Sequence, residues 1–370
     1  MRDSFDTVVV GGGLVGAAIA CGIAARQEHV LILDGDDTDF RASRGNFGLT
    51  WIQGKGADFA PYAHLNTHAE KVWPNFEREL REVTGVDIGL RRGGGYDLCL
   101  TEDEWDARLD EMRSVRAHTN GTFEYEMLEH AELKKRIPAI SDEVLGASFS
   151  PHDGHVNPLY LLRALHALFL HRGGTYRSHH RVDDIESRNG GFSITTQQGG
   201  FEAEHIVLCA GLDNQRLAAN LGMHIPVSPL RGQLMITERT DPFLEHACLQ
   251  VRQTAEGTVQ IGDTHEDVGF NDGTTLDAMA WMAQRAVRYF PHLANVQVNR
   301  AWGALRVMTP DGCPIYQRAT EHPNAVAVSC HSGVTLAALH ATQLADWICG
   351  DAVAAAFEPF SSERFDVQAH

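Results

Sequence analysis

The sequence is poor in basic residues. It has 31 Lys and Arg against 49 Asp and Glu, which gives the 370 residues a formal net charge of −18. An acidic surface repels the phosphates of nucleic acids and the anionic headgroups of membranes. The charge balance therefore disfavours a general nucleic-acid binder and electrostatic attachment to a membrane, although local basic patches remain compatible with it.

Long hydrophobic runs are absent as well. No stretch of the sequence approaches the roughly 20 apolar residues that are needed to cross a bilayer. The first six residues, MRDSFD, are too acidic for a signal peptide and lead directly into a β-branched segment. We therefore expect a cytoplasmic protein.

Cysteine is scattered rather than clustered. Seven cysteines occur, none in a Cys-x-x-Cys pair, and the two nearest have 16 residues between them. This spacing argues against a disulfide framework, a zinc site or an iron–sulfur cluster in this chain, and predicts reduced, partly buried thiols. The 20 histidines include a helical i, i+4 pair, His64 and His68, but lack the further ligands of a zinc site. We expect no bound metal.

The composition is that of a globular protein of about two domains, with 43% hydrophobic and 22% charged residues. No internal repeat or low-complexity linker divides the chain, so the domains are expected to interleave. The pattern of apolar residues predicts helices near 62–84, 102–137, 159–170, 275–290 and 334–348, and strands near 90–100 (with a Gly93–Gly95 break), 146–150, 175–183, 192–197, 205–211 and 325–329.

The N-terminal region has the pattern of a nucleotide-binding βαβ unit. A β-branched strand at 7–10 is followed by Gly11, Gly13 and Gly16, a helix rich in small apolar residues, and a second strand that ends at Asp34. In this fingerprint the first glycine permits a tight turn, the second lets the backbone approach a pyrophosphate, and the third lets helix and strand pack closely. Asp34 is placed to accept hydrogen bonds from ribose hydroxyls.

The fingerprint predicts dinucleotide binding, and a glycine-rich turn without a ligand is the alternative. It does not by itself separate NAD from FAD. Residues 35–60 break the regular βα rhythm of an NAD-binding domain, which favours FAD. In so acidic a chain we expect backbone dipoles at the helix N-terminus, rather than Lys or Arg side chains, to attract the phosphates.

Further segments follow the fingerprint in a recognisable order. They are ASRGNFG (42–48), DGHVNP (153–158), VLCAG (207–211), PLRGQ (229–233), WGALR (302–306), TPDG (309–312) and HSG (331–333). In these segments the chain resembles the FAD-dependent D-amino acid oxidase/glycine oxidase superfamily over nearly its whole length. The SRGNFG segment, the length and the ending ERFDV (363–367) are most similar to the small flavoprotein subunits of opine oxidases, D-hydroxyproline dehydrogenase and hydrogen cyanide synthase.

The resemblance implies a fold of the α/β and α+β classes. A Rossmann-like FAD-binding domain is expected to interleave with a substrate domain built on a mixed or antiparallel sheet. The FAD-binding domain would comprise residues 1–89, 141–225 and 300–370, and the substrate domain residues 90–140 and 226–299.

The resemblance also implies oxidation of an amine next to a carboxylate, with FAD accepting the hydride at N5. The substrate would be a D-amino acid, a D-hydroxyproline-like imino acid or an opine-like secondary amine, and some relatives work with partner subunits that carry iron–sulfur clusters. An oxygen-using glycine or sarcosine-type oxidase is the alternative among enzymes. Two other classes are a subunit needed mainly for assembly or electron relay, and a flavoprotein domain that modifies RNA, which the net charge of −18 disfavours.

Individual roles are implied by the same resemblance. Arg306 matches the position that holds a substrate carboxylate, with a structural salt bridge as the alternative; Arg252 is a second candidate, and His331 is a candidate active-site residue. The implied FAD contacts are Gly11, Gly13, Leu14, Val15 and Gly16, Asp34 at the ribose, Ser43, Arg44, Gly45, Asn46, Phe47 and Gly48 along the isoalloxazine ring, Val182 at the adenine, Ala210 and Gly211 near the pyrophosphate, Arg306, and Ser332, Gly333, Val334 and Thr335 at the start of the last helix, whose N-terminus would point at flavin O2.

Two departures from the family pattern sharpen these expectations. Ala304 stands where sarcosine-oxidase relatives attach flavin through a cysteine, so FAD is expected to bind noncovalently. Gln260 stands where relatives place a lysine that promotes the reaction with oxygen. Without that cation, we expect a dehydrogenase that passes electrons to an acceptor other than oxygen.

Overall fold

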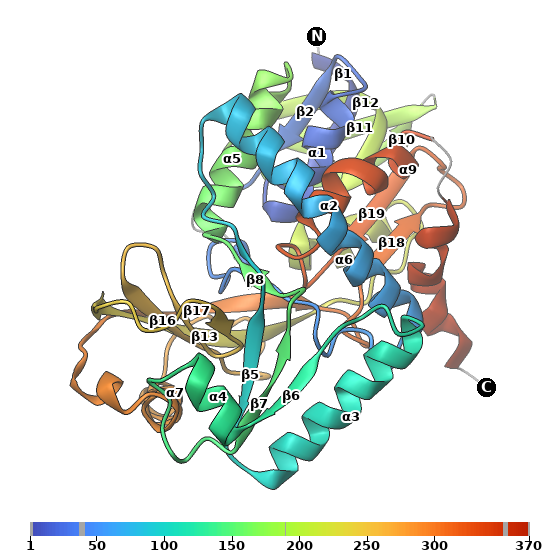
Figure 1. The fold of residues 1–370 in the computed structure, drawn as a ribbon. Helices are drawn as coiled ribbons and strands as arrows, with labels where there is room; N and C mark the ends of the chain where they lie inside the picture. The colour runs from blue at the N-terminus through green and yellow to red at the C-terminus, as the bar shows by residue number, and fades with distance from the viewer. Residues whose placement is uncertain (1–2, 37–40, 189, 351–353, 369–370) are drawn as a thin grey trace.

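The computed structural model of the chain describes residues 3–36, 41–188, 190–350 and 354–368 (Figure 1). An eight-stranded sheet fills the upper part of the view in Figure 1, and its strands are β1 (Asp3–Val10), β2 (Val30–Leu33), β9 (Thr175–Arg177), β10 (Val182–Arg188), β11 (Gly191–Thr196), β12 (Gly199–Leu208), β18 (Ile315–Arg318) and β19 (Ala325–Ser329). Their order is β10-β11-β12-β1-β2-β9, and β19 joins β12 to β18. Strands β19, β12, β1 and β2 and the edge strand β9 run parallel.

The first βαβ unit forms as its sequence predicts. Helix α1 (Leu14–Ala24) connects β1 to β2, and ten of its residues are buried. It is therefore a core helix that is apolar on all sides. Small residues let it lie close to its neighbours, because a Cβ at Gly22 would come 2.4 Å from the carbonyl oxygen of Ala341.

Side chains alternate between the two faces of the large sheet. Val9 and Ile32 pack against α1, α2 (Ala60–Thr84), α5 (Pro158–His171) and the C-terminal helical residues on one face. On the other face Val8 and Leu31 pack toward the β10–β11 hairpin and α6 (Asn214–Ala219). Helix α5 begins at Pro158, and the Asn157 side chain caps it by accepting hydrogen bonds from two backbone amides of its first turn.

Three smaller sheets form the lower part of the molecule in Figure 1. The first contains β13 (Ser228–Arg239), β15 (Val251–Gln253), β16 (Thr258–Gly262) and β17 (Val298–Met308). The second contains β5 (Gly95–Cys99), β6 (Glu126–Glu129), β7 (Gly146–Ser150) and β14 (Ala247–Cys248). The third contains β3 (Leu49–Thr50), β4 (Arg91–Arg92) and β8 (Gly154–His155). Helices α3 (Glu102–His118), α4 (His130–Arg136) and α7 (Leu276–Tyr289) accompany them, and a second core, which includes Tyr96, Val259 and Met282, lies between these elements.

Short 3-10 helices complete the chain, at η1 (Gly211–Asp213), η2 (Pro291–Asn295), η4 (Ala354–Ala356), η5 (Glu358–Phe360) and η6 (Ser362–Gln368). The predicted fold class is confirmed, since the chain combines a largely parallel α/β sheet with mixed and antiparallel sheets. The boundaries of the two interleaved domains stay a prediction. The expected break at Gly93–Gly95 separates β4 from β5.

The segment 102–137, predicted to be helical throughout, is instead α3, β6 and α4. After α3 the chain turns through Asn120 and Gly121, which have φ angles of 52° and 80° in the left-handed region. The Gly121 amide bonds back to the carbonyl of Arg116, which closes the helix end. β6 then forms because it pairs with β7.

The last helix also differs from the prediction of one long helix over 334–348. Regular helix begins only at Ala337, and α8 (Ala337–Leu339), a π-helical turn η3 (His340–Leu344) and α9 (Ala345–Ile348) follow one another. Polar groups before Ala337 are used by other segments: the Thr335 carbonyl accepts a hydrogen bond from Trp73 Nε1 at 2.8 Å, and Thr335 Oγ1 accepts one from the Trp51 amide at 3.1 Å.

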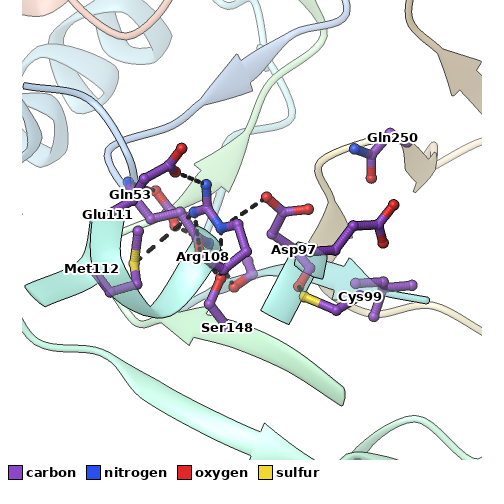
Figure 2. Close-up of polar contacts among 12 residues, drawn as sticks. Gln53, Asp97, Cys99, Arg108, Glu111, Met112, Ser148 and Gln250 are labelled. Atoms are coloured by element: carbon purple, nitrogen blue, oxygen red, sulfur yellow. Dashed lines mark hydrogen bonds and ion pairs between the residues drawn. The ribbon is translucent and has the colours of Figure 1, made fainter. Parts of the chain in front are cut away.

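A buried ion pair connects α3 to β5 (Figure 2). Arg108 Nε lies 3.1 Å from Asp97 Oδ2, and the two side chains are 14% and 9% exposed. The same guanidinium contacts Glu111 and donates to Gln53 Oε1 at 3.3 Å. Burial raises the pKa of Asp97, and the charge of Arg108 opposes that effect. The carboxylate therefore depends on Arg108 to remain charged in the interior.

Replacing Arg108 with methionine is expected to lower the free energy of unfolding by about 3 kcal/mol, because removing one partner leaves a buried charge uncompensated. Arg113→Met on the same helix is the control: its side chain is 64% exposed, and its loss should cost less than about 0.5 kcal/mol. Denaturant unfolding of both variants measures the difference. Equal stability of the two variants would contradict the assignment.

Candidate functional site

A cleft of about 460 Å³ lies at the carboxyl ends of the central strands of the large sheet. Its walls include Val10 at the end of β1, Leu33 at the end of β2, Cys209 after β12, and Val328 in β19. In open α/β sheets, ligands bind in the crevice outside the carboxyl ends of the strands. The cleft therefore occupies the place where this fold accepts a nucleotide.

The glycine turn at the cleft is packed so closely that a Cβ atom does not fit at Gly11 or Gly16. Gly11 has a φ of +103°, and a Cβ on it would lie 2.4 Å from the carbonyl oxygen of Cys209. A Cβ on Gly16 would lie 2.0 Å from the carbonyl oxygen of Gly11, so Gly16 serves the packing of helix on strand. Gly13 lines the cleft and faces the Ser43 hydroxyl, which accepts a hydrogen bond from the Leu14 amide at 2.9 Å.

Asp34 lines the cleft at the end of β2, and protein donors already hold its carboxylate. Oδ2 accepts hydrogen bonds from Arg41 Nη1 and the Tyr176 hydroxyl, each at 2.7 Å. Burial alone would raise its pKa, but the hydrogen bonds from Tyr176 and Arg41 outweigh burial and lower it. Asp34 is thus a preformed anion at neutral pH, and a ribose would share it with these two side chains.

The cleft is more basic than the sequence analysis predicts. Arg41, Arg44 and Arg181 all line it, although the net charge favoured backbone dipoles as the only attraction for phosphates. Net charge describes the whole surface and does not exclude arginines at one site. Arg41 and Arg181 are paired with Asp34 and Asp213 of the same cleft, so the part that arginines play beside the amides of the glycine turn stays a prediction.

The remaining predicted FAD contacts divide into two groups. Those that line the cleft are Gly11, Gly13, Leu14, Val15, Asp34, Ser43, Arg44, Asn46, Val182, Ala210, Gly211 and Gly333. Those outside its lining are Gly16, Gly45, Phe47, Gly48, Arg306, Ser332, Val334 and Thr335. Gly45 packs so tightly on Ala304 that a Cβ would lie 2.1 Å from the Ala304 Cβ. Gly48 has a φ of +90°.

Arg252 sits beneath the segment that the resemblance assigns to the flavin ring. Its guanidinium lies 5.7 Å from the centre of the Phe47 ring, and its Nε donates to the Phe47 carbonyl at 2.6 Å. Its Nη2 donates to Gln260 Oε1 at 2.6 Å. Burial lowers the pKa of Arg252 to about 10, still above neutral pH. A cation therefore lies next to Gln260, and its delocalised guanidinium is bound to the Phe47 carbonyl and to Gln260.

Lys55, which the sequence analysis does not single out, lies behind the HSG turn. Its ammonium donates to Ser332 Oγ at 2.7 Å and to Thr335 Oγ1 at 3.1 Å, and Ser332 Oγ also bonds the Tyr62 hydroxyl. Burial lowers the pKa of Lys55 to about 8. The structure thus has a turn at Gly333 where a helix N-terminus was expected, and Lys55 stabilises this turn through its hydrogen bonds to Ser332 and Thr335. The one feature of the sequence that could have drawn attention to Lys55 is its place between two glycines, Gly54 and Gly56.

His331 lines the cleft, and Arg306 lies near it but outside the cleft lining. The His331 ring is exposed to the cleft that it lines. Loss of hydration between the cleft walls and the nearby charges of Lys55 and Arg306 lower the pKa of His331, which favours the neutral imidazole at physiological pH. Arg306 extends from β17 over Gly232, donates to the Thr264 carbonyl at 2.8 Å and forms an ion pair with Asp263. Its side chain is 14% exposed.

Comparison with known proteins decides the family. The family model described as "FAD dependent oxidoreductase" matches residues 6–347. The chain belongs to this family. It is 40% identical to one of the opine oxidase subunits of Rhizobium meliloti and to its counterpart in Agrobacterium tumefaciens (strain Ach5), over 98% of both chains in each case. The solved glycine oxidase of Geobacillus kaustophilus is similar with a TM-score of 0.87 and 26% identity, over 97% of this chain and 98% of that one.

As a member of this family, the chain is an FAD-dependent oxidoreductase that binds its FAD noncovalently. The cleft fits this cofactor for two reasons. Its glycine turn leaves room for a pyrophosphate, and an aspartate and three arginines line its walls. Ala304, at the position of the attaching cysteine in sarcosine-oxidase relatives, offers no thiol. Within the described ranges, no helix is both long and apolar enough to span a membrane, and no three metal-ligating side chains gather.

Proposed function

We propose that the chain oxidises the C–N bond of an amine that carries an α-carboxylate, with an opine-like secondary amine as the first choice of substrate. D-amino acids and D-hydroxyproline-like imino acids belong to the same chemical class. The observation that carries the proposal is the position of Arg306, a partly exposed guanidinium beside the cleft-lining His331. The 40% identity with the two opine oxidase subunits, over nearly the whole chain, supports the choice of substrate.

FAD, when bound, supplies the acceptor for the hydride that leaves the substrate Cα. The chain's own residues position the substrate. Arg306 presents a planar pair of donors that suits a carboxylate, and holding that group fixes the direction of the Cα–H bond. Neutral His331 lines the cleft without adding a charge. Loss of the hydride and of the N–H proton leaves an imine, which water converts to an oxo acid and an amine.

The electrons are proposed to leave for an acceptor other than oxygen, through a partner polypeptide. Two observations support this. The resemblance assigns the position of Gln260 to the lysine that promotes the oxygen reaction in relatives, and the Arg252 guanidinium beside it hydrogen-bonds to Phe47 and Gln260. The relatives at 40% identity are each named as a subunit of an enzyme.

Reduced flavin in this protein is accordingly expected to react with oxygen at about the rate of free reduced flavin, because Gln260 brings no cation to the position that the resemblance assigns to the oxygen-promoting lysine, and the Lys55 ammonium is already held by Ser332 and Thr335. Stopped-flow mixing of the photoreduced protein with aerated buffer measures this rate, and free reduced FAD in the same buffer is the control. Stoichiometric hydrogen peroxide at the full turnover rate would instead establish an oxidase of the glycine or sarcosine type.

A dye-coupled substrate screen tests the proposed function. The purified holoprotein is mixed with an artificial electron acceptor and with pairs of amines that differ only in the carboxylate, including N-(1-carboxyethyl) amino acids, D-amino acids and D-hydroxyproline. We expect dye reduction with the carboxylated member of a pair and little with its decarboxylated partner. Equal rates within every pair would remove the basis of the proposal.

A further inference from the structure

We propose that Asp263 is a specificity-determining residue of the substrate pocket, which makes the pocket select zwitterions over plain carboxylates. In a zwitterion, an ammonium accompanies the carboxylate. The proposal rests on the function proposed above, since it takes Arg306 as the group that binds the substrate carboxylate. Asp263 directly follows β16, and its carboxylate pairs with Arg306 from β17. The anchor of the substrate thus carries a counter-ion of its own.

The pair is accessible and can be opened. The side chains of Arg306 and Asp263 are 14% and 35% exposed, so a small molecule can reach both. Arg306 Nη1 is held separately by the Thr264 carbonyl at 2.8 Å, which keeps the guanidinium in place when its other nitrogen changes partner. In the described part of the chain, the basic side chains within 4.0 Å of the Asp263 carboxylate are Arg306 and the exposed imidazole of His265.

A neighbouring ion pair, between β13 and the loop after β16, shows what a purely structural one looks like. Arg231 is 3% exposed and pairs with Glu266, which also accepts hydrogen bonds from Gln233 Nε2 at 2.8 Å and Thr264 Oγ1 at 2.5 Å. The hydrogen bond from Arg231 is the main cause that lowers the pKa of Glu266 to about 2. A carboxylate that accepts this many hydrogen bonds does not exchange its partners for a ligand. The Asp263 carboxylate has fewer protein partners and can exchange them more easily.

The position of the pair also suits substrate binding. Arg306 is close enough for its charge to act on His331, which lines the cleft. Gly262, next to Asp263, lies against Phe47 of the predicted flavin segment, because a Cβ on it would be 3.1 Å from the Phe47 ring. The pair therefore lies close both to the segment assigned to the flavin ring, through Gly262, and to the cleft-lining His331, through Arg306.

Exchange of partners explains the selection. A plain carboxylate that takes Arg306 leaves the Asp263 carboxylate without its counter-ion next to a second anion, which opposes binding. A zwitterion replaces both partners at once, because its carboxylate takes Arg306 while its ammonium takes Asp263. The same rule applies to amino acids and to the secondary ammonium of an opine-like molecule, so Asp263 distinguishes amines from the oxo acids and hydroxy acids that share their carboxylate.

Two non-reacting probes of equal shape test the proposal. 2-Methylalanine has no Cα hydrogen to lose, and pivalate is the same molecule with a methyl group in place of the ammonium. Binding of each to the holoenzyme is followed by the change in the flavin spectrum. We expect the wild type to prefer 2-methylalanine by tenfold or more, Asp263→Asn to lose this preference through tighter pivalate binding and weaker 2-methylalanine binding, and Asp263→Glu to retain most of it.

Asp267→Asn is the matched control, since it removes one charge from an exposed residue of the same loop and should leave the preference unchanged. A merely structural Asp263 would alter FAD content or thermal stability and weaken both probes alike. A wild type that binds the two probes equally or binds neither, or an Asp263→Asn variant that keeps the wild-type preference, overturns the proposal. The proposed function fails by a different result, namely that no carboxylated amine reduces the dye.

Discussion

Arg306→Met is expected to lower kcat/KM for a carboxylated amine by about 100- to 1000-fold, since truncating one partner of a hydrogen-bonded charge pair costs roughly 2–5 kcal/mol. The loss should fall on KM and on flavin reduction together, because the carboxylate contact both binds the substrate and orients its Cα–H bond. Arg306→Lys should recover part of the activity, because an ammonium keeps the charge without the planar fork.

The matched control for this variant is Arg300→Met. Arg300 lies on the same strand, is exposed and packs over Trp302 at 5.7 Å, away from Asp263. It should change kcat/KM by less than about twofold. Because Arg306→Met leaves Asp263 without its counter-ion, the double variant Arg306→Met/Asp263→Asn separates lost binding from lost stability. If Arg306→Met alone oxidised carboxylated and decarboxylated amines at the wild-type rates, Arg306 would be only a structural residue.

Gly11→Ala is expected to abolish purification of the protein with FAD and to raise the dissociation constant for added FAD by more than about 100-fold. The added Cβ would meet the Cys209 carbonyl at 2.4 Å on a residue whose φ is +103°, so the turn that exposes the backbone amides must move. The measurements are the ratio of flavin to protein absorbance and the titration of apoprotein with FAD.

Gly222→Ala controls for backbone strain alone. Gly222 also has a left-handed φ, +71°, but no atom lies within 4 Å of its would-be Cβ, and it does not line the cleft. This variant should lose about 1 kcal/mol of stability and keep its FAD. If Gly11→Ala retained a full complement of FAD with wild-type affinity, the glycine turn could not be the pyrophosphate site.

The local features of the fold were predictable because they depend on residues that are close together in the sequence. The first βαβ unit combines a β-branched strand, three spaced glycines and an apolar helix, and each of these depends on neighbours within a few residues. The glycine break before β5 was readable for the same reason. The Asn120–Gly121 turn that ends α3 was also present in the sequence, but helical composition on both sides concealed it.

The contacts of Arg306 and of the HSG turn could not be predicted, because they join distant segments. Asp263 and Arg306 are 43 residues apart, and Lys55 and Ser332 are 277 residues apart. No periodicity or composition links such pairs. The resemblance identified Arg306 as a residue of interest but said nothing about its counter-ion, and the three arginines of the cleft were hidden within a net charge of −18.

Anaerobic reduction of the bound FAD by a Cα-deuterated substrate tests the central claim most directly. An N-(1-carboxyethyl) amino acid, protiated or deuterated at the carbon that is oxidised, is mixed with the holoprotein, and flavin bleaching is followed by stopped flow. The proposed function predicts complete bleaching with release of one oxo acid and one amino acid per FAD, and slower bleaching with the deuterated substrate. If no carboxylated amine, of the opine, D-amino acid or imino acid type, bleached the flavin, C–N oxidation would not be the activity of this chain.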